Sequence, residues 1–277
     1  MSQRLGEEEM NETRVQDLFD LTGRVAIVTG GGTGLGLRSA QSLAECGASV
    51  VIASRRLEVC QEAAKGIQPR PGSEVLARKL DVRRPEEVGP FFDEVRHQFG
   101  KVDILVNNSG TNRDALIDKA DLDNWNEVIE TNLTGTFLCS RAVAPIMIKE
   151  RRGKIINIGS IYGVVGGVPA LYTDLNMVWS GCSVAYAASK GAIIQMTRAM
   201  ACYLAQWGIQ VNCISPGGMD VGQVLDERFK QRYGERCPQG RMGKASEIKA
   251  LVAFLASDAS SYVNGQNIML DGGWTAW

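Results

Sequence analysis

The chain has 277 residues; 30 are Lys or Arg and 31 are Asp or Glu, so its formal net charge is −1 at pH 7. This length suits one α/β core, and the charge pattern lacks the basic stripe of nucleic-acid-binding proteins, so we expect no nucleic-acid partner. Seven cysteines stand singly without a C-x-x-C pair, and the one histidine, His97, excludes most metal centres. We therefore expect a reduced protein with no bound metal.

Residues 1–20 are polar, with three glutamates at positions 7–9, and we interpret them as a mobile arm. They lack the apolar stretch of a signal peptide. The most apolar region, residues 155–171, is interrupted by Asn157, Pro169 and four glycines, which excludes a membrane span. We expect a cytoplasmic protein with no membrane partner.

From Val25 onward, short apolar runs alternate with segments of helical periodicity, which predicts a parallel sheet with crossover helices. Strands are predicted at residues 25–28, 49–53, 75–80, 104–106, 154–158, 210–214 and 268–270. Helices are predicted at residues 34–46, 57–65, 85–99, 125–133, 136–149, 184–207 and 246–256. We expect Pro145 to kink its helix and Ser246 to cap the last one. No linker interrupts the pattern, so residues 21–277 are interpreted as one domain.

A glycine-rich turn, Thr29–Gly36, joins the first predicted strand to the first helix. Glycines let a backbone turn tightly and approach a pyrophosphate, while the helix N-terminus offers free N–H groups to phosphates. The position of this turn inside a βαβ unit favours a dinucleotide site over a flexible loop. The residues assigned to this site are Gly30, Thr33, Gly34, Leu35 and Gly36.

The end of the second strand is expected to select the cofactor, because an acid there binds the ribose 2′-hydroxyl and a base favours the 2′-phosphate. The chain reads Ser54-Arg55-Arg56, with no acid before Glu58. The serine hydroxyl and an arginine guanidinium can both bind a 2′-phosphate, which favours NADP(H), with NAD(H) possible. The alternative is that the two arginines are simply exposed to solvent at the start of a helix. Asp81, followed by Val82, ends the third strand, where its carboxylate either contacts adenine or belongs to an ordinary turn.

Tyr186 and Lys190 lie four residues apart, on the same face of a predicted helix. The free pKa of tyrosine, about 10, is too high for an efficient base at neutral pH. A neighbouring ammonium favours tyrosinate and lowers that pKa. Tyr186 is the only one of six tyrosines with a lysine at this spacing, although such a pair on its own is weak evidence for a site.

Two further polar residues are candidates for chemistry. Ser160 ends the fifth predicted strand, and strand ends at the carboxyl edge of a parallel sheet face the ligand crevice. A hydroxyl there can hold a substrate oxygen as its charge changes; the alternative is a loop serine. Asn132 is a poor helix former within a helical pattern. It either binds a water that links Lys190 to solvent or is an ordinary helix-end asparagine.

The motifs and their order along the chain resemble those of the short-chain dehydrogenase/reductase family, from about Leu18 to Trp277. The resemblance is carried by Thr29–Gly36, Asp81, Asn107–Gly110, Asn132, Ser160, Tyr186 with Lys190, and Pro216–Gly217. It implies an α/β protein with a single-domain Rossmann fold: a doubly wound, seven-stranded parallel sheet with helices on both faces. It also implies a homotetramer or homodimer.

The same resemblance implies a catalytic tetrad of Asn132, Ser160, Tyr186 and Lys190. Tyr186 would donate a proton to a carbonyl oxygen, or accept it in the oxidising direction, while hydride moves to or from the nicotinamide. Ser160 would orient the oxygen, Lys190 would lower the pKa of Tyr186 and hold the ribose, and Asn132 would complete a proton relay. Further cofactor contacts are assigned to Asn108, Gly110, Pro216, Gly217 and Met219.

The chain departs from the family pattern at four places. Ser109 replaces the usual alanine, Thr33 stands where many NADP enzymes carry a base, and residues 216–220 lack the threonine that often binds the carboxamide. The spacing of 26 residues between Ser160 and Tyr186 is longer than usual. It predicts an insertion at about 162–182 that overhangs the site.

The insertion contains Tyr172, Asp174, Asn176 and Trp179, which suit a hydroxylated substrate. With the ending 271–277, it resembles the branch of gluconate 5-dehydrogenases and related sugar-acid or polyol oxidoreductases. Three alternatives stay open. The first is a 3-oxoacyl-thioester (acyl-carrier-protein) reductase, for which the three cations between positions 228 and 232 would dock the carrier. The others are a reductase of unrelated ketones and a non-catalytic nucleotide-sensing scaffold.

Overall fold

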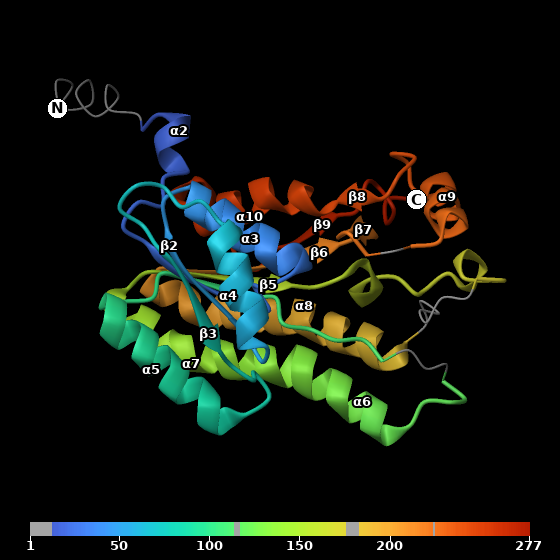
Figure 1. The fold of residues 1–277 in the computed structure, drawn as a ribbon, viewed down its shortest axis with the longest axis horizontal. Helices are drawn as coiled ribbons and strands as arrows, with labels where there is room; N and C mark the ends of the chain where they lie inside the picture. Colours follow the sequence, from blue (N-terminus) through green and yellow to red (C-terminus); the bar gives the residue numbers. More distant parts are fainter. Residues whose placement is uncertain (1–12, 114–116, 176–182, 224) are drawn as a thin grey trace.

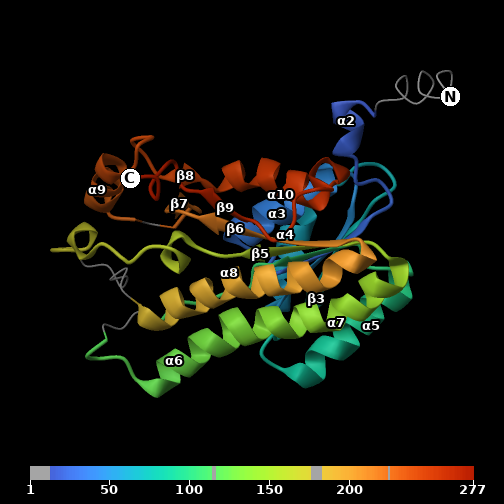
Figure 2. The ribbon, with the colours of Figure 1, turned by 180° about the vertical axis from the view of Figure 1, so that it is seen from behind.

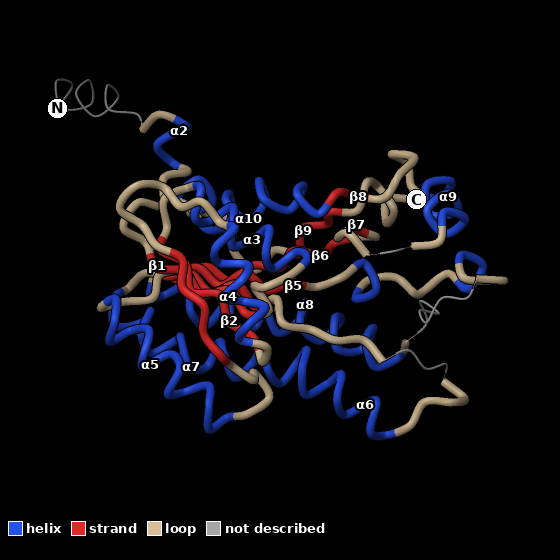
Figure 3. The backbone as a smooth tube through the Cα atoms, in the orientation of Figure 1, coloured by secondary structure: helices blue, strands red, loops and turns tan. Residues whose placement is uncertain are grey.

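The computed structural model describes residues 13–113, 117–175, 183–223 and 225–277. Its core is a sheet of seven parallel strands in the order β3-β2-β1-β4-β5-β6-β9. Figure 3 shows the strands in red, with helices around them. The strands are β1 (Val25–Thr29), β2 (Ser49–Ser54), β3 (Val75–Lys79), β4 (Ile104–Asn107), β5 (Gly153–Ile158), β6 (Ile209–Pro216) and β9 (Asn267–Leu270). The predicted doubly wound, seven-stranded parallel sheet is confirmed.

Helices cover both faces of the sheet (Figures 1 and 2). One face carries α3 (Gly34–Glu45), α4 (Leu57–Gly66) and α10 (Ile248–Ala256). The other carries α5 (Pro85–Phe99), α7 (Gly135–Glu150) and α8 (Val184–Leu204). The sequence of β1 explains this arrangement, because all five of its residues are buried. Successive side chains alternate between faces: Ile27 packs in the cluster under α5 and α7, whereas Ala26 and Val28 pack under α3.

The two helices predicted at 125–133 and 136–149 form one continuous helical run. It passes from α6 (Leu122–Ile129) through a π-helical turn, Glu130–Thr134, into α7 without a gap. A π turn accommodates one extra residue without ending the helix, and Asn132 lies within it. Pro145 lies inside α7, which continues on both sides of it. The kink expected at Pro145 stays a prediction.

Ser246 is not an N-cap, so that prediction is wrong. It lies inside a short 3-10 turn, Ala245–Glu247, that precedes α10. The capping contact comes instead from Glu247, whose Oε2 accepts the backbone N–H of Lys244 at 2.7 Å. A glutamate that reaches back three residues satisfies an orphan donor as well as a serine would.

Several described elements were not predicted. They are α2 (Val15–Leu18), α9 (Glu227–Arg236), the two-stranded sheet of β7 (Met219–Asp220) and β8 (Gly243–Lys244), and short 3-10 turns. Within α9 only Phe229 and Tyr233 are large apolar side chains, too few for a periodic signal. α2 falls within the stretch interpreted as a mobile arm, of which residues 1–12 lie outside the described part. α9 and the C-terminus lie together at one end of the molecule, and α2 at the other (Figure 1).

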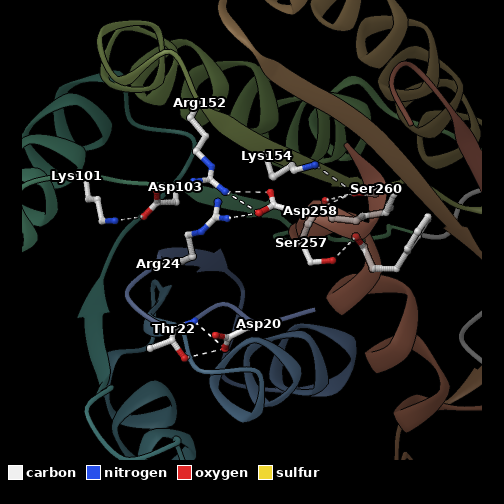
Figure 4. A network of polar contacts seen from close by, with 12 residues as sticks. Asp20, Thr22, Arg24, Lys101, Asp103, Arg152, Lys154, Ser257, Asp258 and Ser260 are labelled. Atoms are coloured by element: carbon white, nitrogen blue, oxygen red, sulfur yellow. Dashed lines mark hydrogen bonds and ion pairs between the residues drawn. The ribbon is translucent and has the colours of Figure 1, made fainter. Parts of the chain in front are cut away.

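A polar network lies at the amino ends of the strands (Figure 4). Asp258 accepts hydrogen bonds from Arg24 at 2.9 Å and from Arg152 at 2.8 Å. Lys154, the second residue of β5, donates from Nζ to the Ser260 hydroxyl at 3.2 Å. The network ties β1 and β5 to the segment that follows α10, at the end of the sheet opposite the ligand crevice.

Lys154 makes the folding stability depend on pH, because burial lowers its pKa from 10.5 to about 8. Between these values the unfolded chain binds more protons than the folded one, so stability rises with pH; below pH 8 the full cost of the buried ammonium is present. We expect Lys154→Met to raise the free energy of unfolding at pH 7 by about 1–3 kcal/mol. Urea unfolding at pH 7 and pH 10 measures this, and a difference that does not shrink at pH 10 would contradict it.

Within the described residues, no helix is long and apolar enough to cross a membrane. The same residues contain no group of three or more His, Cys, Asp or Glu side chains that could hold a metal ion.

Candidate active site

The carboxyl ends of the central strands open into a cavity of about 1550 Å³. It lies where the strand order reverses between β1 and β4, the place where open α/β sheets bind ligands. Of the residues predicted for the catalytic tetrad and the cofactor contacts, only Asn132 and Gly36 do not line this cavity. Most of the predicted residues therefore gather around one cavity, and the contacts around each residue define what it can do there.

The glycine-rich turn follows β1 and leads into α3. Gly30 and Gly34 have positive φ angles of 64° and 53°, which only glycine adopts readily. A Cβ on Gly30 would lie 2.8 Å from the amide nitrogen of Asn108. That amide donates to the carbonyls of Thr29 and Gly30 at 3.0 and 3.1 Å, so Asn108 braces the turn as well as lining the cavity.

The N-terminus of α3 is open to an anion. Its N-cap residue, Thr33, makes no side-chain hydrogen bond to the helix, which leaves the first N–H groups available for phosphate. Gly36 is packed against the turn, where a Cβ would collide with Gly30 and Asn108. This close helix-to-turn packing is the role of the last glycine in dinucleotide-binding turns. The residues present therefore fit a dinucleotide.

The end of β2 supplies the groups predicted to select the cofactor. Arg55 and Arg56 are exposed, line the cavity and form no ion pair with other described residues. Ser54 donates its hydroxyl to the carbonyl of Arg56 at 3.0 Å and accepts from the Cys60 thiol at 3.2 Å. The two guanidinium groups can therefore receive a phosphate, and the serine hydroxyl shapes the turn that holds them.

Asp81 is already paired within the protein. Its two carboxylate oxygens accept from Nε and Nη2 of Arg83 at 3.0 and 2.6 Å. These hydrogen bonds hold the pKa of Asp81 below its usual value. Sequence reasoning missed Arg83, although a basic residue two positions after the acid was a visible signal. Asp81 and Val82 still line the cavity. An adenine in contact with Asp81 would therefore meet a carboxylate that is already hydrogen-bonded to Arg83.

Three of the four tetrad residues meet at the cavity. Tyr186 and Lys190 lie in the first two turns of α8, which begins after its N-cap Ser183. Ser160 lies two residues after the end of β5 and shares a hydrogen bond with the Tyr186 side chain. Lys190 donates from Nζ to the carbonyl of Ile158 at 2.7 Å, and this Nζ lies 5.6 Å from the Tyr186 ring centroid.

Asn132 lies behind the cavity and is fully buried. Its Oδ1 accepts the backbone N–H of Thr111 at 2.7 Å. Its amide donates to the Thr111 carbonyl at 3.0 Å and to the Ser189 hydroxyl at 3.1 Å. These contacts occupy both N–H bonds of the side chain. Asn132 therefore braces the segment after β4 against α8, and its amide has no N–H left for the predicted water.

Burial controls the ionisation of the tyrosine–lysine pair. It raises the pKa of Tyr186, which the Ser160 hydrogen bond lowers only in part and the neighbouring Tyr162 raises further. Burial also lowers the pKa of Lys190 from 10.5 to about 8. In the protein alone the Tyr186 pKa is therefore raised, whereas the sequence predicted a lowered one, because the cost of burial outweighs the Ser160 hydrogen bond.

The described part of the insertion packs against α9 and forms a wall of the cavity. Tyr162 and Tyr172 place their hydroxyl oxygens 3.1 Å apart, and the Tyr172 ring lies 5.3 Å from that of Phe229 in α9. All three line the cavity, as do Tyr233 and Met242. Sequence reasoning had named only Tyr172 from this wall.

The other residues predicted in the insertion do not form this wall. Asp174 is exposed and does not line the cavity. Asn176 and Trp179 lie outside the described residues.

Together, the fold and the cavity define a dinucleotide-binding α/β oxidoreductase. A family model described as "Enoyl-(Acyl carrier protein) reductase" matches residues 30–275. The chain belongs to the short-chain dehydrogenase/reductase family, whose members bind NAD(P), and its sheet is the Rossmann-like fold of that family.

Curated relatives and solved structures cover nearly the whole chain. The 3-oxoacyl-(acyl-carrier-protein) reductase of Escherichia coli (strain K12) is 36% identical over 92% of this chain and 98% of its own length. The NADP-dependent mannitol dehydrogenase of Alternaria alternata is 34% identical over 95% and 96%. The structure of a gluconate 5-dehydrogenase from Burkholderia cenocepacia J2315, in complex with NADP and tartrate, has a TM-score of 0.85 and 36% identity over 95% of this chain and 100% of that one.

Proposed function

We propose that this protein is an NADP(H)-preferring oxidoreductase that interconverts a secondary alcohol and a ketone on a sugar acid or polyol. The observation that carries the proposal is the position of Tyr186. It is hydrogen-bonded to Ser160, has Lys190 beneath its ring, and lines the same cavity as the glycine-rich turn. A proton donor thus faces the space in which a bound dinucleotide and a carbonyl would meet.

In this proposal the nicotinamide supplies or accepts the hydride, and the protein's own residues manage the proton. The raised pKa of Tyr186 keeps its hydroxyl protonated at neutral pH, so it donates a proton to the carbonyl oxygen in the reducing direction. Ser160 shares a hydrogen bond with Tyr186 and can hold the same oxygen. Lys190 places its ammonium against the tyrosine ring, where positive charge stabilises the tyrosinate left behind. Oxidation runs through the same groups in reverse.

The wall beside Tyr186 supports a hydroxylated substrate. Tyr162 and Tyr172 bring phenol groups to the cavity, which offer hydrogen bonds and ring faces for sugar C–H groups. The relatives named for mannitol and gluconate agree with this class.

The second candidate is a 3-oxoacyl-thioester reductase, which the Escherichia coli relative favours. The cations on α9 that would dock an acidic carrier are engaged within the protein. Arg228 pairs with Asp226 at 2.8 Å, Lys230 pairs with Glu227 at 2.7 Å, and Arg232 donates to the Thr173 carbonyl at 2.5 Å. This pairing weakens the expected docking surface, so we rank the sugar-acid or polyol reaction first.

Initial rates of nicotinamide oxidation test the choice. 5-Ketogluconate, fructose and an acetoacetyl thioester are compared at equal concentrations with NADPH and with NADH. We expect turnover of 5-ketogluconate or fructose, with NADPH preferred. Turnover of the thioester alone would overturn the substrate proposal and promote the second candidate.

Arg55 gives a separate test of cofactor preference. Because a charged hydrogen bond to phosphate contributes about 1.5–3 kcal/mol, Arg55→Asp is expected to raise the KM for NADPH about 10- to 100-fold. The KM for NADH is expected to change little, since that cofactor lacks the 2′-phosphate. Lys149→Asp, an exposed cation that does not line the cavity, is the control for net charge. Equal changes for both cofactors would show that the phosphate is not recognised here.

We also propose that the protein works in the cytoplasm as a homotetramer or homodimer. Phe137 on α7 and Trp125 on α6 are large apolar side chains that are 46% and 36% exposed, on the helical run that flanks the sheet. Apolar surface of this kind is often covered by a second copy. Light scattering in solution measures the oligomeric state, and the mass of a monomer would contradict the proposed homotetramer or homodimer.

A further inference from the structure

The turn that follows β6 forms one wall of the cavity, at residues 216–219. Backbone partners hold two of its groups: Gly217 donates to the Leu270 carbonyl at 3.0 Å, and Gly218 accepts from the N–H of Gly243 at 2.9 Å. The third contact comes from a side chain. The N–H of Gly218 donates to the Tyr233 hydroxyl at 2.6 Å.

Tyr233 is also held by the C-terminal segment. It belongs to α9, is 3% exposed, and stacks on Trp274 with ring centroids 4.4 Å apart and planes 15° from parallel. The Arg236 guanidinium lies 5.8 Å from the same indole ring. The C-terminal segment therefore holds the Tyr233 ring, and with it the hydroxyl that faces the turn.

The turn lies flat against the Tyr233 ring. A Cβ on Gly217 would come within 2.8 Å of the hydroxyl oxygen, and one on Gly218 within 2.6 Å of the ring carbon that carries the hydroxyl. Real Cβ atoms do not approach so closely, so the two glycines are required by this contact.

Tyr233 also belongs to the substrate wall. It lines the cavity, and its ring lies 6.1 Å from that of Phe229, which in turn contacts Tyr172 of the insertion. One side chain thus joins the wall on the cofactor side to the wall on the substrate side.

We propose that Tyr233 is a positioning residue: its hydroxyl fixes the turn 216–218 and thereby sets where the nicotinamide lies relative to Tyr186. The effect on hydride transfer can be measured only if the proposed function is right, so that part of the inference rests on the proposed function. The effect on cofactor binding can be measured without any substrate and does not depend on it.

Tyr233→Phe tests the proposal, because it keeps the ring and the stack on Trp274 and removes only the hydroxyl. It leaves the Gly218 N–H without its partner. We expect the Kd for NADPH, measured by calorimetry, to rise about tenfold, which corresponds to about 1.4 kcal/mol. We also expect the primary deuterium isotope effect on single-turnover reduction with 4-deuterio-NADPH to change, because it reports the hydride step alone.

Tyr203→Phe is the matched control. Tyr203 also packs against a tryptophan, Trp207, at 5.1 Å, but it is 63% exposed and does not line the cavity. We expect wild-type Kd and isotope effect from it. If Tyr233→Phe lowers only the melting temperature and keeps the wild-type Kd, Tyr233 is a structural residue and the proposal is overturned. If the Kd rises while no tested ketone is reduced by the wild type, the positioning role stands and the proposed substrate class fails.

Discussion

Tyr186→Phe is expected to lower kcat at least about 1000-fold, toward the upper end of what a positioned proton donor contributes. The phenylalanine ring keeps the packing of α8 against the cavity, but the atom that gives up the proton is gone. The Kd for NADPH is expected to stay within about threefold of the wild type, since the predicted phosphate contacts lie on other elements. Single-turnover oxidation of NADPH and calorimetric binding measure the two effects.

The pH dependence gives this expectation a direction. Because burial raises the pKa of Tyr186, its hydroxyl stays protonated across neutral pH. Reduction, which uses the protonated form, is expected to be insensitive to this group between pH 6 and 9, whereas oxidation is expected to accelerate as pH rises. Tyr262→Phe, at an exposed tyrosine, is the control. More than a tenth of wild-type turnover in Tyr186→Phe would remove Tyr186 from the mechanism.

Lys190→Met is expected to lower kcat/KM about 100- to 1000-fold. The substitution keeps the length of the side chain while it removes the ammonium beneath the Tyr186 ring and the donor to the Ile158 carbonyl. Without that positive charge, the tyrosinate formed during reduction loses its stabilising neighbour. Initial rates with the best ketone and NADPH measure the loss.

The lowered pKa of Lys190 provides a second signature. Since this pKa is about 8, the ammonium predominates below pH 8 and is lost above it. Wild-type kcat/KM is expected to show an inflection near pH 8 that Lys190→Met lacks. Lys154→Met is a matched control, because Lys154 is buried with the same pKa at the opposite end of the sheet. A similar loss of activity in both variants would point to a general effect of burying a methionine.

The elements that the sequence predicted well are those whose patterns are local. β1 is a continuous apolar run because both of its faces are covered, and the high glycine content of the turn after it identifies that turn in the sequence. The long helix that begins near Tyr186 has both periodicity and a closing glycine, Gly208, with a positive φ of 71°. These features place the cavity and most of its lining from the sequence alone.

The features that sequence analysis missed depend on contacts between distant segments. α9 carries too few apolar residues to show a helical period. Its aromatic side chains pack against the rings of Tyr172 and Trp274, which come from distant parts of the chain. The pKa of Tyr186 depends on how deeply the ring is buried, which no spacing to Lys190 reveals. The buried amide of Asn132 is engaged by Thr111, a partner 21 residues away.

The most direct test of the central claim follows the hydride itself. The wild-type protein is incubated with 4-deuterio-NADPH and 5-ketogluconate or fructose, and the product alcohol is examined by mass spectrometry. We expect one deuterium on the carbon that bore the ketone, with Tyr186→Phe yielding almost none of this product. NADPH oxidation that leaves the product free of deuterium, or labelled product formed equally well by Tyr186→Phe, would contradict hydride transfer assisted by Tyr186.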